Sequence, residues 1–476
     1  MIGRIRERDI LHQCAESKNS EFVALYGRRR VGKTYLVKEF FGGSFTFYAT
    51  GILNERSGME AQLENFNDEI VNYGGEDLPR ARNWRDAFAN LNKLVERASC
   101  KGKKIIFLDE IPWMATVNSD FLPALDYFWN RWASSRHDVL LIICGSATSW
   151  IIDKIVDNRG GLHNRLTRQI ALSPFTLSEC EEYYRDTGIV MTRYQMVEAY
   201  MIFGGIPYYM SLMNPGYDLF QNVDMMYFNE NALLRNEYDN LYNSLFRDAK
   251  NHILVVEALA SKGIGMTRED IIRATGLTNG GSLTRILRQL EQSGFIRVYL
   301  AFGNKEKDKL YQLIDAFTLF HLRFNKGRKQ WTEDYWIKYS ATPAHNTWSG
   351  YAFEKVCLLH LPQIKRKLGI SGVLTGAYAW RSGKQESGGA QIDLVIDRND
   401  HVINLCEMKF FRGEYDIDKK EDAALRNRRA AFESGTKTRK AVRTTIVTTF
   451  GLKRTAYASE YNSVVLLDDL FEDAVY

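Results

Sequence analysis

The first third of the chain alternates short apolar runs with segments of helical period. The apolar runs predict five buried strands, at residues 22–27, 44–50, 103–110, 138–146 and 168–175. Amphipathic segments between them, such as residues 83–99 and 120–135, predict helices. Strands that are apolar on both faces and alternate with helices are typical of a parallel sheet covered on both sides. The pattern therefore predicts an α/β domain over residues 1–175.

Three further regions follow this domain. Residues 176–245 have a helical pattern, which the turn Asn214-Pro215-Gly216 interrupts. Residues 246–315 contain three helical segments and then two short strands with a lysine-rich tip, which predicts a winged helix-turn-helix. Residues 316–476 form the last region, and residues 390–411 within it predict an apolar β-hairpin.

Composition narrows the class of protein without naming a function. The net charge of +5 over 476 residues permits a local basic face for nucleic acid but does not require one. Six scattered cysteines without a CxxC pair argue against a zinc site or a disulfide framework. The charged residues 1–9 do not resemble a signal peptide, and no apolar run reaches the roughly 18 residues of a membrane span. We expect a cytoplasmic protein that does not enter a membrane.

A phosphate-binding loop follows the first predicted strand. The sequence GRRRVGKT, residues 27–34, fits the pattern GxxxxGKT and opens a helix. In such a loop Lys33 reaches the β- and γ-phosphates, and the Thr34 hydroxyl binds Mg²⁺. The backbone N–H groups around the phosphates would come from Gly27, Arg28, Arg29, Arg30, Val31 and Gly32.

The third predicted strand supplies the acidic partner of this loop. In IIFLDEI, Asp109 would hold Mg²⁺ through water opposite Thr34, and Glu110 would orient and activate the attacking water. Ser146 ends the next strand, where it would contact the γ-phosphate or that water; a simple turn serine is the alternative. Arg165 is a candidate arginine finger, supplied by the same chain or a neighbour, and Arg168 competes for the role.

These motifs occur in an order that resembles the archaeal-type ATPases, which are AAA+/STAND-like P-loop proteins. The order begins with IGRIRERDILHQ (residues 2–13), continues through the motifs above and ends with GGIPYYM (residues 204–210). The resemblance implies that the chain binds ATP and Mg²⁺, with Gly3 and Arg4 near the adenine. It also implies that Gly204, Gly205 and Pro207 belong to a helical lid, and that a winged helix and a C-terminal domain follow.

The predicted winged helix carries basic residues where such folds contact DNA. Its third helix, which enters the major groove in DNA-binding members, contains Arg285 and Arg288. Lys305, Lys307 and Lys309 lie on the wing, where they would neutralise phosphates. Winged helices also serve as protein-interaction modules and spacers, and both alternatives stay open.

The predicted hairpin carries polar residues within apolar strands. A three-residue turn at Asn399–His401 places Asp393 opposite Glu407, and strand alternation puts Lys409 on the same face. Two carboxylates this close repel each other unless a divalent cation lies between them. The lysine would hold or activate a water beside a scissile phosphate. An exposed surface pair is the alternative interpretation.

The D-x13-E-x-K spacing resembles the PD-(D/E)XK nucleases, whose fold is that of restriction endonucleases. The resemblance implies a further acid from a preceding helix, Glu354, and a contact of Lys420 with the DNA backbone. The implied site is then Glu354, Asp393, Glu407 and Lys409, with Mg²⁺ or Mn²⁺ bound by Asp393 and Glu407. Gln391-Ile392 replaces the proline that gives the superfamily its name.

The sequence thus predicts an ATP-hydrolysing switch coupled to a Mg²⁺-dependent DNA nuclease-like effector. Its architecture would be a P-loop sheet, a helical lid, a winged helix and a restriction-endonuclease-like α/β domain. One rival is a nucleotide-gated DNA-binding regulator with an inactive nuclease-like domain. A second is a signalling ATPase with a protein partner. An arginine finger supplied by another subunit would require a homo-oligomer.

Overall fold

The structure is a computed structural model, and its described residues fall into two compact units. It describes residues 1–52, 58–116, 119–157, 162, 164–246, 248–303, 308–328, 332–382 and 390–473. The units are Met1–Pro174 and Phe175–Tyr476. Within the described ranges, none of the helices combines the length and apolar character that crossing a bilayer requires.

A parallel five-stranded sheet forms the centre of the first unit, and this prediction is confirmed. Its strands pair in the order β2-β3-β4-β1-β5, and every pairing is parallel. Their bounds are β1 (Glu21–Tyr26), β2 (Phe47–Thr50), β3 (Lys104–Asp109), β4 (Val139–Gly145) and β5 (Arg168–Ala171). Each strand overlaps one of the five apolar runs, although β1 begins one residue earlier, at Glu21. The inner strands β1 and β4 are apolar because they are buried on both faces, whereas the edge strand β5 exposes Arg168 and Gln169.

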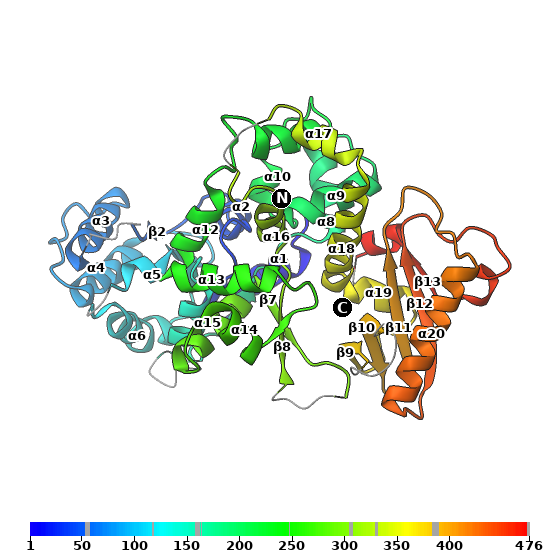
Figure 1. Cartoon of the computed structure of the whole chain (residues 1–476). Coiled ribbons are helices and arrows are strands. Elements are labelled where there is room, and N and C mark those ends of the chain that lie inside the picture. The colour runs from blue at the N-terminus through cyan, green and yellow to red at the C-terminus, as the bar shows by residue number, and fades with distance from the viewer. Residues whose placement is uncertain are drawn as a thin grey trace. The chain divides into compact units, whose positions relative to one another are not determined.

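Helices cover this sheet (Figure 1). They are α1 (Ile5–Glu16), α2 (Lys33–Phe40), α3 (Met59–Asn72), α4 (Trp84–Arg97), α5 (Ile111–Met114), α6 (Phe121–Arg131) and α7 (Thr148–Ile151). One core joins alternate strand residues such as Phe22 and Ile106 to Phe66 of α3, Trp84 of α4 and Phe128 of α6. Because all strands run the same way, their carboxyl ends meet at one edge, which brings distant loops together there.

The second unit begins with short helices. They are α8 (Leu177–Asp186), α9 (Arg193–Phe203), α10 (Pro207–Met210), α11 (Leu219–Val223) and α12 (Glu237–Leu245). Capping boxes fix where α8 and α9 begin, since the side chains of Thr176 and Thr192 each accept the backbone N–H of the third helical residue. Gly204 ends α9 in the left-handed region, at φ 66°.

Three helices and a small antiparallel sheet follow. The helices are α13 (Ala249–Ala260), α14 (Arg268–Thr275) and α15 (Gly281–Gln292). The strands are β6 (Met266–Thr267), β7 (Ile296–Tyr299) and β8 (Leu310–Leu313), paired in the order β6-β8-β7. Leu283, Ile286, Leu287 and Leu290 form the buried face of α15, at the spacing that an amphipathic helix requires.

A second five-stranded sheet forms the C-terminal part, in the order β13-β12-β11-β10-β9 (Figure 1). The strands are β9 (Thr375–Arg381), β10 (Gln391–Arg398), β11 (Val402–Lys409), β12 (Ala441–Thr448) and β13 (Val464–Leu466). The helices are α16 (Ala316–Phe324), α17 (Tyr335–Ser340), α18 (Pro343–Leu359), α19 (Leu361–Lys367) and α20 (Lys419–Thr436). Strands β9, β10 and β11 pair in antiparallel fashion, whereas β11, β12 and β13 pair in parallel.

The predicted hairpin register is confirmed. Leu394 pairs with Cys406 and Asp397 with Ile403, the register in which Asp393 lies opposite Glu407. The chain turns back on itself at His401, which has a left-handed φ of 65°. The register follows from the hairpin's short turn and its buried face, since a one-residue slip would turn every apolar side chain outward.

Residues after β7 pack against this second sheet. The backbone N–H of Phe302 donates to the carbonyl of Ala379 in β9 at 2.7 Å. The Phe302 ring lies 5.1 Å from Phe432 of α20. The base of the predicted wing is therefore held by the C-terminal sheet, and Lys305 and Lys307 lie outside the described residues.

Candidate functional site

The loop between β1 and α2 has the conformation of a phosphate cradle. Gly32 caps α2 at a φ of 91°, and Arg30 also has a left-handed φ of 74°. The Lys33 ammonium crosses the loop and donates to the carbonyls of Gly27 and Arg28, both at 3.0 Å. A side chain at Gly27 is excluded, because its Cβ would lie 2.2 Å from the Leu172 carbonyl oxygen.

Thr34 and Asp109 meet at the edge of the sheet. The Thr34 hydroxyl donates to Asp109 Oδ2 at 2.6 Å, although the two residues are 75 positions apart in the chain. The other oxygen, Oδ1, accepts the backbone N–H of Glu110 at 2.9 Å. Asp109 is buried at the end of β3, beside Thr34, the residue that the sequence analysis placed opposite it.

Glu110 is turned away from Asp109. Its backbone lies in the left-handed region, at φ 48° and ψ 45°. The carboxylate accepts both the hydroxyl and the backbone N–H of Ser146, at 2.9 and 3.1 Å. A non-glycine residue with this backbone is uncommon, and such strain often accompanies functional positions. Adjacent acids therefore have different partners, which suits two different roles.

These groups fit Mg²⁺ and a nucleoside triphosphate. A hydroxyl and a carboxylate oxygen 2.6 Å apart are oxygen ligands of the kind that Mg²⁺ prefers. A Cβ built on Gly32 would meet no atom within 4 Å, so the loop stays open where phosphates would approach the backbone. The ammonium of Lys33 and the N-terminus of α2 favour negative charge at the same place.

The remaining predicted nucleotide-site residues lie in the same unit but differ in their surroundings. Buried Arg4 donates to the carbonyls of Ser173, at 2.7 Å, and of Val31, at 3.1 Å, so it braces the phosphate loop from behind. Gly3, beside it, has a left-handed φ of 53°. Arg165 is exposed in the turn before β5, and Arg168 is exposed at the first residue of β5.

The second unit brings Glu407 and Lys409 together near the end of β11. The Lys409 ammonium lies 3.0 Å from the Glu407 carboxylate. Arg428 of α20 lies 3.1 Å from the same carboxylate. Burial by itself lowers the pKa of Lys409, but the carboxylates of Glu407 and Glu421 outweigh it and leave the pKa above its ordinary value. Glu407 is thus neutralised by cations of its own chain.

Sequence reasoning missed two members of this cluster. Glu421 of α20 lies 3.5 Å from Lys409 and 3.4 Å from Arg428, and it accepts the Tyr415 hydroxyl at 2.6 Å. The signal was present in the sequence, because Glu421 and Arg428 are seven residues apart and so share one face of the helix. Lys420, the residue that the sequence favoured, is exposed in the first turn.

Glu354 and Asp393 face this cluster from α18 and β10. Burial, reinforced by the charge of Asp393, raises the pKa of Glu354 to about 8. Desolvation lowers the pKa of the neighbouring Lys355, whose ammonium lies 3.9 Å from Glu354. Asp393 accepts the side-chain amide of Gln391 at 2.7 Å. The charges of Asp393, Glu407 and Lys409 therefore all act on Glu354.

The cluster is not a preformed cation site. Across the described ranges, no three His, Cys, Asp or Glu side chains are arranged to hold a metal ion. Glu407 is held by Lys409 and Arg428, so a cation at Asp393 and Glu407 would have to weaken those ion pairs. The donor set still suits a divalent cation, because the pKa of Glu354 is raised by burial and then by the charges of Asp393 and Glu407, and a cation would offset those charges.

Three of the predicted DNA-contact residues of residues 246–315 lie within the described ranges, and they differ in exposure. Arg285 and Arg288 are exposed on α15, opposite its buried leucine face. Lys309 precedes β8 and is half-buried.

Known proteins resemble this chain in its sequence and its fold. Residues 2–213 match the family described as "ATPase domain predominantly from Archaea". An uncharacterized protein of Methanocaldococcus jannaschii is 24% identical over 416 residues, which are 86% of this chain and 87% of the relative. The structure of a Walker-type ATPase of Pyrococcus abyssi has a TM-score of 0.50 and 18% identity; the match covers 68% of this chain and 96% of that one, and shows a shared fold. Residues 2–213 of this chain therefore carry an archaeal-type ATPase domain with the P-loop fold.

Proposed function

We propose that this protein is an ATP-binding and ATP-hydrolysing switch whose C-terminal part is a metal-dependent nuclease-like effector acting on DNA. Lys33 would bind the β- and γ-phosphates, and Thr34 and Asp109 would hold Mg²⁺. When bound, the cation neutralises charge on the phosphates. Glu110 would orient the attacking water and take its proton, with Ser146 fixing the carboxylate.

The main support for the proposed ATPase activity is that the carboxylates of Asp109 and Glu110 have different partners. One carboxylate meets the threonine of the phosphate loop, at 2.6 Å, and the next meets Ser146 of the adjacent strand, at 2.9 Å. A cation ligand and a general base have to point in different directions. The left-handed backbone at Glu110 provides that divergence within two consecutive residues.

The nuclease half rests on the grouping of Glu354, Asp393, Glu407 and Lys409. The mixed sheet with its β10–β11 hairpin, α18 before it and α20 after it supports the restriction-endonuclease-like fold that the sequence resembles. Asp393 and Glu407 would hold Mg²⁺ or Mn²⁺, with Glu354 beside them, and Lys409 would orient a water next to the phosphate. A buried acid that favours its protonated form, Glu354, would also become ionised when a cation binds beside it.

Residues 246–315 are proposed to form a winged helix. The order β6-β8-β7 and the helices α13, α14 and α15 support this fold. In the DNA-binding alternative, α15 enters a groove through Arg285 and Arg288, and the wing lysines contact phosphates. The packing of Phe302 on Ala379 and Phe432 favours the other alternative, a spacer that joins the ATPase to the effector.

Plasmid cleavage tests the nuclease half directly. Full-length protein is incubated with plasmid DNA, Mg²⁺ or Mn²⁺, with and without ATP, and compared with Lys409→Ala. Cleavage should disappear in this variant and persist in Lys338→Ala, which removes an exposed lysine of α17. Cleavage that survives Lys409→Ala would exclude the proposed site, whatever its metal requirement.

A second candidate function is a nucleotide-gated DNA-binding regulator whose nuclease-like domain does not cut. The observation that favours it is the pairing of Glu407 with Lys409 and Arg428, which gives this carboxylate its counter-charges without a metal. ATP hydrolysis together with an intact plasmid under every metal and nucleotide condition would support this alternative.

A further inference from the structure

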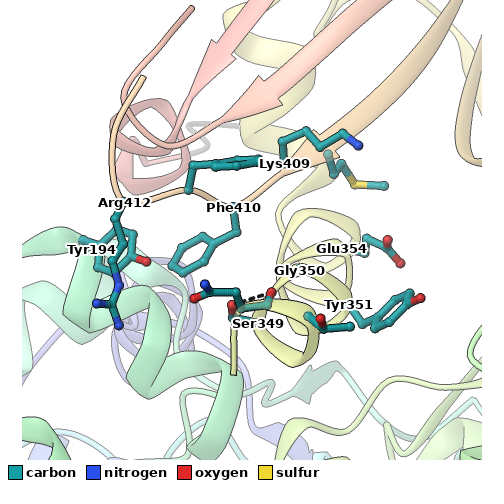
Figure 2. A pocket seen from close by; sticks show the side chains of 12 residues that line it. Tyr194, Ser349, Gly350, Tyr351, Glu354, Lys409, Phe410 and Arg412 are labelled. Carbon is teal, nitrogen blue, oxygen red and sulfur yellow. Dashed lines mark hydrogen bonds between the residues drawn. The ribbon is translucent and has the colours of Figure 1, made fainter. Parts of the chain in front are cut away.

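A cavity of about 410 Å³ opens beside the proposed cleavage residues, within the second unit (Figure 2). Its walls come from α9, the first half of α18 and the segment that leaves β11. The lining residues that matter most are Tyr194, Tyr351, Glu354, Lys409, Phe411 and Arg412. Because Glu354 and Lys409 belong to both, the cavity is continuous with the carboxylate cluster.

Two aromatic rings that line this cavity are partly exposed, and one of them, Phe411, also packs against Tyr415 with ring centroids 5.2 Å apart. Tyr351 is 65% exposed and Phe411 is 46% exposed, although both are large and can stack. Deeper in the wall, Tyr194 already stacks on Phe410, with ring centroids 4.5 Å apart and planes inclined by 19°. Exposed rings beside a cavity are typical of a surface that covers a flat ligand.

Cations and small polar groups complete the lining. The Arg412 guanidinium donates to the Ser340 carbonyl at 3.0 Å, which fixes it at the mouth of the cavity. Lys409 enters from the other end, on the side of the cluster. Ser349 and Gly350 form part of the wall on α18, and a Cβ built on Gly350 would meet no atom within 4 Å. The wall is therefore open where a ligand would rest against this helix.

This combination matches one class of ligand. Stacking rings suit a nucleobase, and neighbouring cations suit the phosphates on either side of it. The volume lies in the range of roughly 300–1,000 Å³ that is usual for small-ligand sites. A base within a continuous duplex is stacked and paired, so it cannot enter a cavity unless it is unpaired or flipped out.

We propose that this cavity holds an unpaired nucleotide of the nucleic-acid substrate, next to the phosphodiester that the effector acts on. The preferred substrate is then a strand with a single-stranded tail or flap, rather than a continuous duplex. Tyr351 and Phe411 stack on the base, and Arg412 and Lys409 hold the flanking phosphates. The inference rests on the proposed nuclease-like function, to which it adds the form of the substrate.

Binding measured without cleavage tests this inference. Full-length protein in EDTA is titrated into fluorescein-labelled duplexes of equal length that are blunt or carry a ten-nucleotide 5′ or 3′ tail. A second set carries 2-aminopurine in the tail, whose fluorescence falls when the base stacks. We expect tighter binding of a tailed duplex, quenching of the 2-aminopurine, and about tenfold weaker binding of the tail by Tyr351→Ala or Phe411→Ala.

The matched control is Tyr217→Ala, which removes another exposed tyrosine of the same unit that is not part of the cavity. Equal affinity for blunt and tailed duplexes, or variants that bind the tail as tightly as the parent protein, would overturn the inference. The readout is separate from that of the proposed function. If the protein binds the tail but cleaves no DNA, the proposed nuclease activity is rejected and the nucleotide-binding role of the cavity is retained. If it cleaves DNA but neither variant weakens tail binding, the nuclease activity is retained and the role of the cavity is rejected.

Discussion

The two carboxylate clusters of this protein differ in the charge of the groups that contact their carboxylates. In the first unit, Asp109 and Glu110 accept hydrogen bonds from neutral donors, namely Thr34, Ser146 and the backbone. In the second unit, Glu407 is paired with the cations Lys409 and Arg428. A site with neutral partners keeps its negative charge for an arriving cation, whereas a site with cationic partners has already cancelled it.

This difference predicts that the two sites differ in their affinity for a divalent cation. A carboxylate that is hydrogen-bonded but uncompensated attracts Mg²⁺ with little rearrangement. A carboxylate that is already ion-paired has to exchange one partner for another, so its affinity for metal is lower. The same comparison explains Glu354, which is the surplus acid of the second site and has its pKa raised to about 8 by burial and by Asp393.

The largest expected effect lies at the nucleotide site. Glu110→Gln should lower the rate of ATP hydrolysis by about 10²- to 10⁴-fold, because a general base is lost. ATP affinity should change little, since Lys33 and Thr34 remain. Single-turnover hydrolysis and equilibrium nucleotide binding measure the two quantities. Glu76→Gln, at an exposed acid, is the control; normal hydrolysis in Glu110→Gln would place the base elsewhere and break the comparison.

The second expected effect concerns the free energy of unfolding, and it tests whether burial raises the pKa of an acid in the second unit. Glu198 of α9 is 3% exposed, and burial raises its pKa from the ordinary 4.5 to about 7. Its contribution to stability is therefore complete below pH 4.5 and lost as the pH rises through 7. Glu198→Gln should raise the free energy of unfolding at pH 8 by up to about 3 kcal/mol, at 1.36 kcal/mol per pKa unit.

Urea denaturation between pH 4 and pH 8 measures this change. His345, 3.9 Å from Glu198, has the opposite dependence, because burial lowers its pKa to about 4. Its contribution is present above pH 6.5 and lost as the pH falls toward 4, and it should remain in Glu198→Gln. Glu230→Gln, at an exposed acid, should leave the profile unchanged. An identical profile in Glu198→Gln would show that folding does not raise the pKa of Glu198.

The third effect concerns the cations around Glu407. Arg428→Gln removes one counter-charge and should tighten Mn²⁺ binding at the cluster by about tenfold, because less positive charge opposes the metal. Calorimetric titration of nucleotide-free protein measures the affinity. Arg429→Gln is the matched control, since the neighbouring arginine pairs with Glu433 on the outer face of α20. Unchanged affinity in Arg428→Gln would mean that ion pairing does not limit metal binding there.

The smallest effect separates the two alternatives for the winged-helix region. If α15 contacts phosphates, the double variant Arg285→Ala and Arg288→Ala should weaken DNA binding at every sequence. It should also reduce the slope of log affinity against log salt by about 1 to 2. Binding measured from 50 to 200 mM salt tests this expectation, with Arg268→Ala of α14 as the control. An unchanged slope would favour the spacer role that the packing of Phe302 supports.

Elements with a local cause could be predicted from the pattern of amino acids alone. The five apolar runs correspond to five parallel strands, and for the inner strands β3 and β4 the cause, burial on both faces, is visible in the run itself. The phosphate loop, the strand before it and the helix after it are contiguous, so one motif specifies their geometry. The hairpin register at Asp393 and Glu407 also followed from a short turn and strict alternation.

Contacts between side chains that are far apart in the sequence depend on how whole elements pack together. Glu421 and Arg428 reach Glu407 and Lys409 because α20 packs beside β11, and the strand pattern carries no information about that contact. The same is true of the cavity, whose walls come from α9, α18 and the chain after β11. Local periodicity states which face of an element is buried, but the partner of that face depends on how several elements pack around a shared core.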